Sequence, residues 1–222
     1  MSVMKNMLIA DLRNVNSVEA ARNIEEVKNV VTLILPENGD PEVLDAIAAI
    51  PKINIANTIY LPIGAPTRSI NGSARLSAPM LQQEGLLVIS GSCVVTEVCN
   101  DCKAILSIAG SLKHPKSCAV KNVNVAGSCK ALDYEHYISF DDDFELDAAT
   151  LDLLDYKTLL DIDGDLYVSK NVSLEQLKEK MPYFIVDGDV RCTQELAAYM
   201  KLRAEIDGRL RIKVPHFLED DE

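Results

Sequence analysis

The chain contains no tryptophan, and aromatic residues make up only 5% of its 222 residues. Positive charge is also scarce, since 22 Lys and Arg stand against 34 Asp and Glu, for a formal net charge of −12. Non-specific binding to nucleic acid or to an anionic membrane depends on clustered Lys and Arg. The composition therefore excludes nucleic acid and membrane as partners and favours a basic protein or a cation.

Long apolar runs are absent as well, and none approaches the roughly 20 residues that span a bilayer. The first residues, MSVMKNMLIADLRN, have no long apolar segment followed by a small-residue cleavage site. We therefore expect a cytoplasmic protein whose six cysteines are reduced thiols and not a disulfide framework. Hydrophobic residues still form 48% of the chain, which is enough for a substantial core.

One short pattern recurs along the chain: a hydrophobic residue, any residue, glycine, any residue and a second hydrophobic residue. Seven of the ten glycines occupy its central position, which in the fifth copy is held by an aspartate. Successive central positions are 15 to 24 residues apart, a spacing typical of the coils of a solenoid. The central residues are Gly72, Gly91, Gly110, Gly127, Asp142, Gly164, Gly188 and Gly208.

Apolar residues stand two places before and two places after every central position, from Ile70 and Ala74 in the first copy to Ile206 and Leu210 in the last. The positions between them are mostly Ser, Asp, Lys or Arg. This period-two alternation predicts strands that turn one face towards a core. The central glycine predicts a bend where a side chain would clash, so we expect a different bend at Asp142.

Helices are expected only near the two ends of the chain. Capping residues and apolar spacing place them at about residues 17–27, 41–50, 147–156, 173–181 and 193–203. Near the N-terminus, apolar pairs recur after 26 residues, which indicates strand-helix repeats. These pairs are Met7 and Ile9, Leu33 and Leu35, and Ile59 and Leu61.

The expected fold is an α+β solenoid, with β-helix-like coils of about 15–26 residues and helices added in the N- and C-terminal coils. We interpret residues 1–222 as one continuous solenoid. It has strand-helix coils over 1–56, short β coils over 57–146, strand-helix coils over 147–213 and an acidic tail over 214–222. The helical N-terminus and the tail, which contains Pro215, are candidate caps for the open ends.

The short hydrophobic-x-Gly-x-hydrophobic coils, over about residues 68–146, resemble those of bactofilins, the polymer-forming β-helices of the bacterial cytoskeleton. This resemblance implies a self-assembling scaffold without catalysis. The strand-helix repeats at the ends depart from an all-β bactofilin and are similar to leucine-rich repeats, which implies a surface that binds a partner.

The segment VCNDCKAILSIAGSLKHPKSC places Cys99, Cys102, His114 and Cys118 at spacings that suit a zinc site. The 19 residues between Cys99 and Cys118 also equal the local coil length, so these two thiols are expected to stack in adjacent coils. A buried cysteine stack, a structural zinc and a regulatory disulfide all fit this spacing. His114 falls at a position that is otherwise apolar, which favours the cysteine stack.

The other three cysteines, Cys93, Cys129 and Cys192, fall at inward positions and are expected to pack as small hydrophobic residues. A nucleophilic pair of Cys118 and His114 is the enzymatic alternative, but no third orienting group or glycine-rich oxyanion turn accompanies it. No phosphate-binding loop, dinucleotide fingerprint or zinc-protease motif is present, and the six-residue period of a hexapeptide acyltransferase fails. We therefore assign no catalytic or cofactor-binding residue.

Carboxylates flank the central position in the last four copies, where the first four mostly carry serine. Stacked at strand spacing, carboxylates repel one another, and calcium or a basic partner would relieve this repulsion. Solvated aspartates at exposed bends are the alternative interpretation. The aspartates concerned are Asp141, Asp143, Asp163, Asp165, Asp187, Asp189 and Asp207.

The sequence favours a non-enzymatic scaffold that binds a protein partner or assembles with itself to a limited extent. One alternative is a metal-dependent binding module that uses zinc or calcium. The other is an enzyme with a Cys/His site near residues 99–118. The identity of a partner and the oligomeric state do not follow from the sequence.

Overall fold

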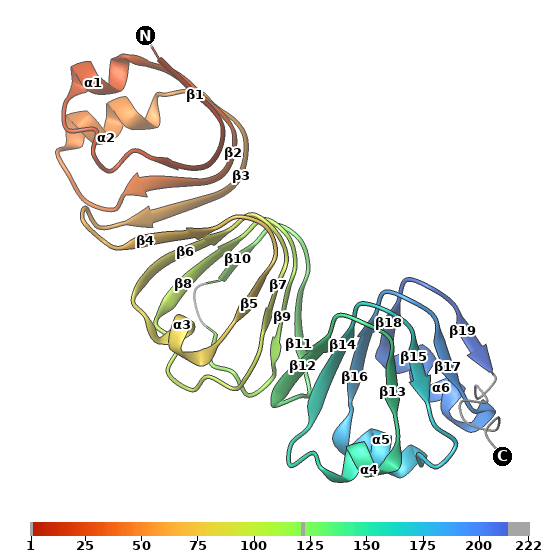
Figure 1. Ribbon diagram of the computed structural model, residues 1–222. Coiled ribbons are helices and arrows are strands. Elements are labelled where there is room, and N and C mark those ends of the chain that lie inside the picture. Colours follow the sequence, from red (N-terminus) through yellow and green to blue (C-terminus); the bar gives the residue numbers. More distant parts are fainter. Residues whose placement is uncertain (1, 121–122, 213–222) are drawn as a thin grey trace. The chain divides into compact units, whose positions relative to one another are not determined.

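The computed structural model describes residues 2–120 and 123–212, so the expected tail cap from Val214 lies outside the described residues. The described strands pair in parallel in several sheets, with few and short helices, which makes this an α+β protein (Figure 1). None of the described helices is long and apolar enough to cross a membrane. The chain divides into two compact units. Unit 1 comprises Met1–Val95, Cys99–Lys113 and Cys118–Lys130, and unit 2 comprises Thr96–Val98, His114–Ser117 and Ala131–Glu222.

Unit 1 begins with a three-stranded sheet in the order β1-β2-β3, whose strands are joined by two helices. The helices cover one face of this sheet, where their apolar side chains pack with Leu33 and Leu35 (Figure 1). The opposite face packs against the next sheet through Ile34 and Ile59. The elements are β1 (Ser2–Asp11), α1 (Val18–Arg22), β2 (Ile24–Pro36), α2 (Pro41–Ala48) and β3 (Lys52–Leu61).

Three asparagines bend the strands of this sheet at matching places. Asn6, Asn29 and Asn54 have φ angles of 55°, 51° and 53°, in the left-handed region that asparagine tolerates better than most residues. Their side chains form a ladder. Asn29 Nδ2 donates to Asn6 Oδ1 at 3.0 Å, and Asn54 Nδ2 donates to Asn29 Oδ1 at 2.9 Å.

The expected register of this first sheet is wrong. Met7 pairs with Val30 and Ile34 pairs with Ile59, whereas the 26-residue repeat had placed Leu33 opposite both Met7 and Ile59. Because β2 is buried on both faces at its C-terminal end, apolar spacing alone does not set its register. The asparagine ladder sets the register. Its members are 23 and 25 residues apart, and the paired residues Met7, Val30 and Ile55 have the same spacings.

Unit 1 continues with two four-stranded sheets, in the orders β10-β8-β6-β4 and β11-β9-β7-β5. Each repeat contributes one strand to each sheet, on either side of its central glycine. The first sheet comprises β4 (Thr67–Ile70), β6 (Gly85–Ile89), β8 (Ala104–Ile108) and β10 (Val123–Val125). The second comprises β5 (Ala74–Leu76), β7 (Cys93–Val95), β9 (Leu112–Pro115) and β11 (Cys129–Leu132).

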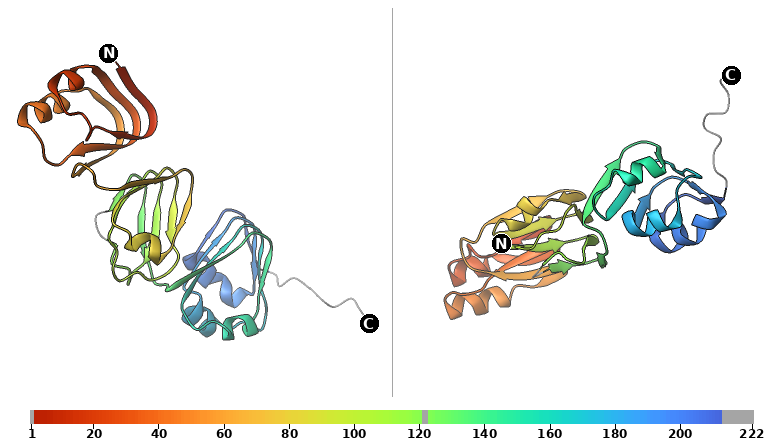
Figure 2. Two further views of the ribbon diagram at one scale, coloured as in Figure 1. Left: turned by 60° about the vertical axis from the view of Figure 1, so that its left-hand side comes forward. Right: turned by 90° about the horizontal axis from the view of Figure 1, so that it is seen from below.

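Unit 2 repeats this plan with sheets in the orders β12-β14-β16-β18 and β13-β15-β17-β19 (Figure 2). Three helices pack onto its core in chain order, through Leu151, Leu177 and Leu196 among others. The first sheet has β12 (His136–Phe140), β14 (Thr158–Ile162), β16 (Tyr183–Val186) and β18 (Ala204–Ile206). The second has β13 (Phe144–Leu146), β15 (Leu166–Val168), β17 (Val190–Cys192) and β19 (Leu210–Ile212), and the helices are α4 (Ala148–Asp152), α5 (Leu174–Lys180) and α6 (Gln194–Arg203).

Strand pairing confirms the alignment of the copies within each unit. Ile70 pairs with Ile89 and Ile89 with Ile108, as expected for residues two places before the centre. In unit 2, Phe144 pairs with Leu166, as expected for residues two places after it. The apolar alternation therefore fixes the register of these repeats, as it should when one strand face is buried.

The central glycines are required wherever one repeat lies on the preceding one. An added Cβ at Gly91 would lie 2.5 Å from the carbonyl carbon of Gly72, and one at Gly188 would lie 2.4 Å from the carbonyl oxygen of Gly164. At Gly72, in the first repeat of unit 1, an added Cβ would meet nothing within 4 Å. Crowding therefore requires glycine only where a repeat precedes it, whereas Gly72 has a φ of 90°, which favours glycine independently of the space.

Asp142 stands in the first repeat of unit 2 and is exposed, which explains why aspartate replaces glycine there. In the described part of the chain, β10 and β11 pair with β8 and β9, and β12 and β13 pair with β14 and β15, while β12 also forms an antiparallel bridge between His136 and Glu97. The described repeats thus contribute to separate sheets in the two units.

Three helix expectations need correction. The helix expected at about residues 147–156 ends at Asp152, with Leu153 as its C-cap. The first helix ends at Arg22 and not near Val27, because β2 already begins at Ile24 and pairs with β1. A short helix, α3 (Ala78–Gln82), lies in the central region, where we expected none. Pro79 in its first turn is compatible with a helix start, since a proline there leaves no intrahelical hydrogen bond unmade.

Candidate functional site

The aspartates after the central position bind the backbone of the next repeat. Asp143 Oδ1 accepts a hydrogen bond from the Asp165 N–H, and Asp165 Oδ1 accepts one from the Asp189 N–H, each at 2.8 Å. Asp189 Oδ1 accepts from the Arg209 N–H at 2.8 Å. These amides lie at the bend between two strands, so a side-chain oxygen satisfies a backbone donor there.

Serine side chains accept the equivalent hydrogen bonds in unit 1. Ser92 Oγ accepts from the Ser111 N–H at 3.0 Å, and Ser111 Oγ accepts from the Ser128 N–H at 3.2 Å. Serine in the early copies and aspartate in the late copies are therefore two solutions to one structural requirement. The change from Ser to Asp along the chain does not by itself indicate a cation site.

The remaining oxygens of two of these aspartates bind cations of the chain itself. Arg191 Nη2 lies 3.3 Å from Asp165 Oδ2 and its guanidinium lies over the Tyr167 ring, 4.8 Å from the ring centroid. Arg211 Nε donates to Asp189 Oδ2. The hydrogen bond from the Arg209 N–H, followed by that from Arg211, lowers the pKa of Asp189, which keeps this carboxylate ionised. Asp165 and Asp189 are thus already partnered.

The aspartates before the central position are exposed and crowd one another in unit 2. Burial of its carboxyl group raises the pKa of Asp187, and the charges of Asp163, Asp207 and Asp161 raise it further. This is the repulsion that the sequence predicts for stacked carboxylates. In the described residues, however, no three His, Cys, Asp or Glu side chains gather so that they could hold a metal ion.

Replacing Asp187 by asparagine is expected to raise the thermal midpoint of unit 2 by about 1–2 °C in low salt. The neutral amide removes repulsion from Asp163 and Asp207, and added salt should shrink the gain by screening. Because the folded-state pKa is raised, the wild-type penalty exists only above the ordinary carboxyl pKa of 3.8, and the gain should vanish in more acidic solution. Scanning calorimetry measures it, with Asp155→Asn as the charge-matched control; a lower midpoint for Asp187→Asn would contradict the account.

The cysteines of the zinc-like segment lie in the loops on either side of β8 and β9. Cys102 Sγ lies 3.7 Å from Cys118 Sγ and 3.4 Å from the carbonyl oxygen of Cys99. The Ala119 N–H donates to the same Cys99 carbonyl at 3.0 Å, which holds the two loops together. The close thiol pair is therefore Cys102 with Cys118.

The fourth candidate ligand does not join the thiols in a metal-binding group. His114 lies in β9, its Nδ1 is 2.9 Å from the carbonyl oxygen of Pro115, and the described residues contain no group of three His, Cys, Asp or Glu side chains that could hold a metal ion. Cys99 and Cys118 are buried, as the cysteine stack predicts. Burial raises the pKa of the Cys102 and Cys118 thiols, so few thiolates exist near neutral pH for metal binding or nucleophilic attack.

Of the three cysteines expected to face the core, two are buried and one is exposed. Cys93 and Cys192 are buried, and burial raises the pKa of both thiols, that of Cys93 to about 12. Cys129 is exposed, contrary to expectation. It lies in β11, at the edge of its sheet, where no further described strand covers it.

A site that sequence reasoning missed is the edge of the first sheet formed by β3. Ile53 and Tyr60 on this strand and Ile63 just after it are 51%, 63% and 63% exposed. Tyr60 pairs with Leu35, which is only 7% exposed, so the apolar pattern gave no sign that Tyr60 is at the surface. The described strands give β3 one neighbour, β2.

The only charged side chain of β3, that of Lys52, is occupied. Its Nζ donates to the carbonyl oxygens of Ile47, Ala48 and Ile50 at 2.9–3.0 Å and so caps the C-terminus of α2. Burial lowers the pKa of this amine. β3 therefore carries no free charged side chain along its ten residues, of which seven, Ile55–Leu61, lie beyond the bend at Asn54.

Comparison with protein-family models, with curated proteins and with solved structures found no match. The function must therefore be argued from the chemistry of the described residues.

Proposed function

We propose that this protein is a non-catalytic scaffold whose repeats wind as solenoids and which self-associates to a dimer through the edge strand β3. The observation that carries the proposal is the unprotected edge: β3 is ten residues long, has one described neighbour and bears no free charge. Natural sheets usually protect such edges with charged side chains, proline or bulges, because unpaired backbone recruits another strand.

The other long edge strand of the same sheet is better protected. β1 is also ten residues long, but it carries the exposed Lys5, and its exposed apolar residues Val3 and Met7 are only 38% and 37% exposed. Edge strands in the remaining sheets have five residues or fewer. Pairing of β3 with β3 of a second copy joins identical surfaces about a two-fold axis, which closes the assembly at two chains.

The interior chemistry supports a scaffold and not a catalyst. The aspartates and serines beside the central position bind backbone amides, and the buried thiols have raised pKa values. At Gly164 and Gly188 an added Cβ would meet the preceding repeat, so we expect the side chain of Asp142 to oppose the stacking of a further repeat onto the first repeat of unit 2. Limited association therefore fits better than an open polymer.

Sedimentation equilibrium over a concentration series tests this function. We expect the wild-type chain to reach twice the monomer mass and to stop there. The double variant Ile53→Lys/Tyr60→Lys should weaken the dimer by at least about tenfold, since charge on an edge opposes strand pairing.

The matched control is Leu153→Lys/Leu202→Lys, which adds the same two charges at apolar residues that are 82% and 80% exposed in unit 2. This control should dimerise like the wild type. A wild-type chain that stays monomeric at every concentration, or whose mass grows without limit, would overturn the proposal.

A further inference from the structure

The thiol pair in unit 1 is a feature that the scaffold function does not use. We propose that Cys102 and Cys118 form a reversible disulfide that staples two consecutive repeats. Their sulfur atoms are 3.7 Å apart, and a disulfide bond requires about 2.05 Å. The hydrogen bond from Ala119 to Cys99 already holds the two loops in register, so rotation of the two side chains supplies most of the approach.

The burial of the two thiols determines which of them the oxidant reaches first. Cys102 is half-buried and within reach of a small oxidant, whereas Cys118 is 7% exposed and Cys99 only 1%. With hydrogen peroxide as the oxidant, the Cys102 sulfur attacks the O–O bond, becomes a sulfenic acid and releases one water. The Cys118 sulfur then attacks the sulfenic sulfur, loses its proton and expels a second water. Two thiols and one peroxide thus give one disulfide and two waters, and a small dithiol reverses the change.

The reaction should be slow near neutral pH. Burial raises the pKa of both thiols, and the attacking species is the thiolate. This suits a staple that forms under sustained oxidation and is absent from the freshly reduced protein. It also means that the test should follow the reaction over hours.

The experiment uses the full chain with Cys129→Ser, because exposed Cys129 would otherwise join two chains. Of the six cysteines, five then remain. We expect hydrogen peroxide to lower the thiol count in denaturant from five to three and the mass by about 2 Da, with peptide 117–121 joined to peptide 76–103 after tryptic digestion. The thermal midpoint of unit 1 should rise by about 5 °C and return on reduction.

Variants assign the bond to its two sulfurs. Adding Cys102→Ser or Cys118→Ser should abolish the cross-linked peptide, whereas adding Cys99→Ser should leave it. The proposal is overturned if the cross-link survives either of the first two changes, if all five thiols persist, or if the mass rises by about 32 Da as sulfinic acid forms instead.

Discussion

Replacing Gly188 by alanine is expected to lower the free energy of unfolding of unit 2 by about 3 kcal/mol, and its thermal midpoint by about 12–15 °C. The new Cβ would lie 2.4 Å from the carbonyl oxygen of Gly164 and 2.5 Å from Asp165 Oδ1. A carbon and an oxygen atom cannot approach so closely without steric overlap. The backbones of the two repeats must therefore move apart. That separation also weakens the 2.9 Å hydrogen bond from the Gly188 N–H to the Gly164 carbonyl. Urea unfolding monitored by circular dichroism measures the loss.

The matched control is Asp142→Ala, which also places alanine at a central position. Asp142 stands in the first repeat of unit 2, where no repeat of its stack precedes it, so we expect a change within about 0.5 kcal/mol. Equal losses for the two variants would show that the central position is not selected by stacking. A harmless Gly188→Ala would show the same more directly.

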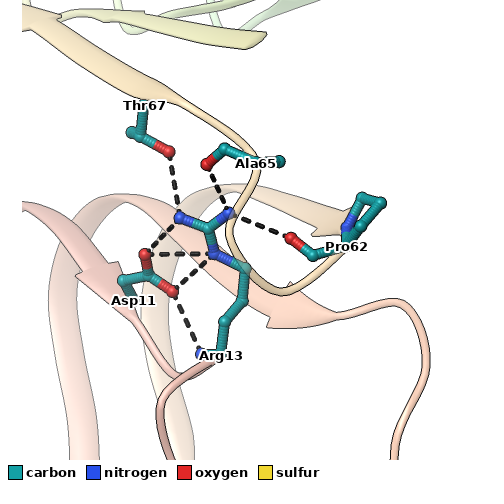
Figure 3. Close-up of polar contacts among 5 residues, drawn as sticks. All are labelled: Asp11, Arg13, Pro62, Ala65 and Thr67. Carbon is teal, nitrogen blue, oxygen red and sulfur yellow. Dashed lines mark hydrogen bonds and ion pairs between the residues drawn. The ribbon is translucent and has the colours of Figure 1, made fainter.

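Replacing Arg13 by methionine is expected to lower the free energy of unfolding of unit 1 by about 2–4 kcal/mol. Arg13 is 8% exposed, and every nitrogen of its guanidinium is bonded (Figure 3). Nε and Nη2 contact the Asp11 carboxylate, Nη1 donates to the carbonyl oxygens of Pro62 and Ala65 at 3.1 and 2.8 Å, and Nη2 donates to Thr67 Oγ1 at 3.1 Å. Methionine would keep the stem but leave a carboxylate and two carbonyls without these donors.

The pH dependence separates the ion pair from general packing. Burial alone would raise the pKa of Asp11, but the hydrogen bonds and charge of Arg13 outweigh burial and lower it. A lowered folded-state pKa adds stability above the ordinary value of 3.8, and this stability is lost as the pH falls through the folded-state pKa. The difference between wild type and Arg13→Met should therefore shrink in acid. Arg22→Met, at an exposed position, should change little, and a penalty that stays constant from pH 7 to pH 2.5 would contradict this explanation.

Much of the strand register could be predicted from the sequence, because one face of each short strand is buried and period-two alternation then permits a single register. The alignment of Ile70 with Ile89 and of Phe144 with Leu166 follows from this alone. The single aspartate among the central positions stands in the first repeat of unit 2. We expected only a different bend at Asp142, since the clash that glycine avoids becomes apparent only once the repeats are stacked.

The contacts between distant residues could not be predicted, because no local pattern marks them. The guanidinium of Arg13 donates hydrogen bonds to the carbonyl oxygens of Pro62 and Ala65, which are 49 and 52 residues further along the chain. The exposure of Tyr60 follows from the lack of a described strand beyond β3, which no sequence window reveals. Likewise, the 19-residue spacing placed Cys99 and Cys118 in adjacent coils, as the hydrogen bond from the Ala119 N–H to the Cys99 carbonyl supports, but it gave no sign that Cys102 Sγ lies 3.7 Å from Cys118 Sγ.

Hydrogen bonds to backbone amides change the interpretation of the stacked aspartates as a candidate site. Stacked aspartates suggested calcium when considered as surface charges, but Asp143 and Asp165 accept hydrogen bonds from the next repeat. Polar side chains at a repeated bend are therefore explained first by hydrogen bonds to the backbone of the neighbouring repeat. The surfaces left for function are those whose backbone has no such partner among the described residues, and β3 is the longest of them without a free charge.

The measurement that tests the central claim most directly is amide hydrogen exchange in β3 as a function of protein concentration. We predict that amides of Lys52–Leu61 exchange more slowly as the concentration rises, while those of the edge strands β13 and β18 in unit 2 do not change. Exchange in β3 that is independent of concentration while the mass doubles would place the interface elsewhere and contradict the proposed edge-to-edge dimer.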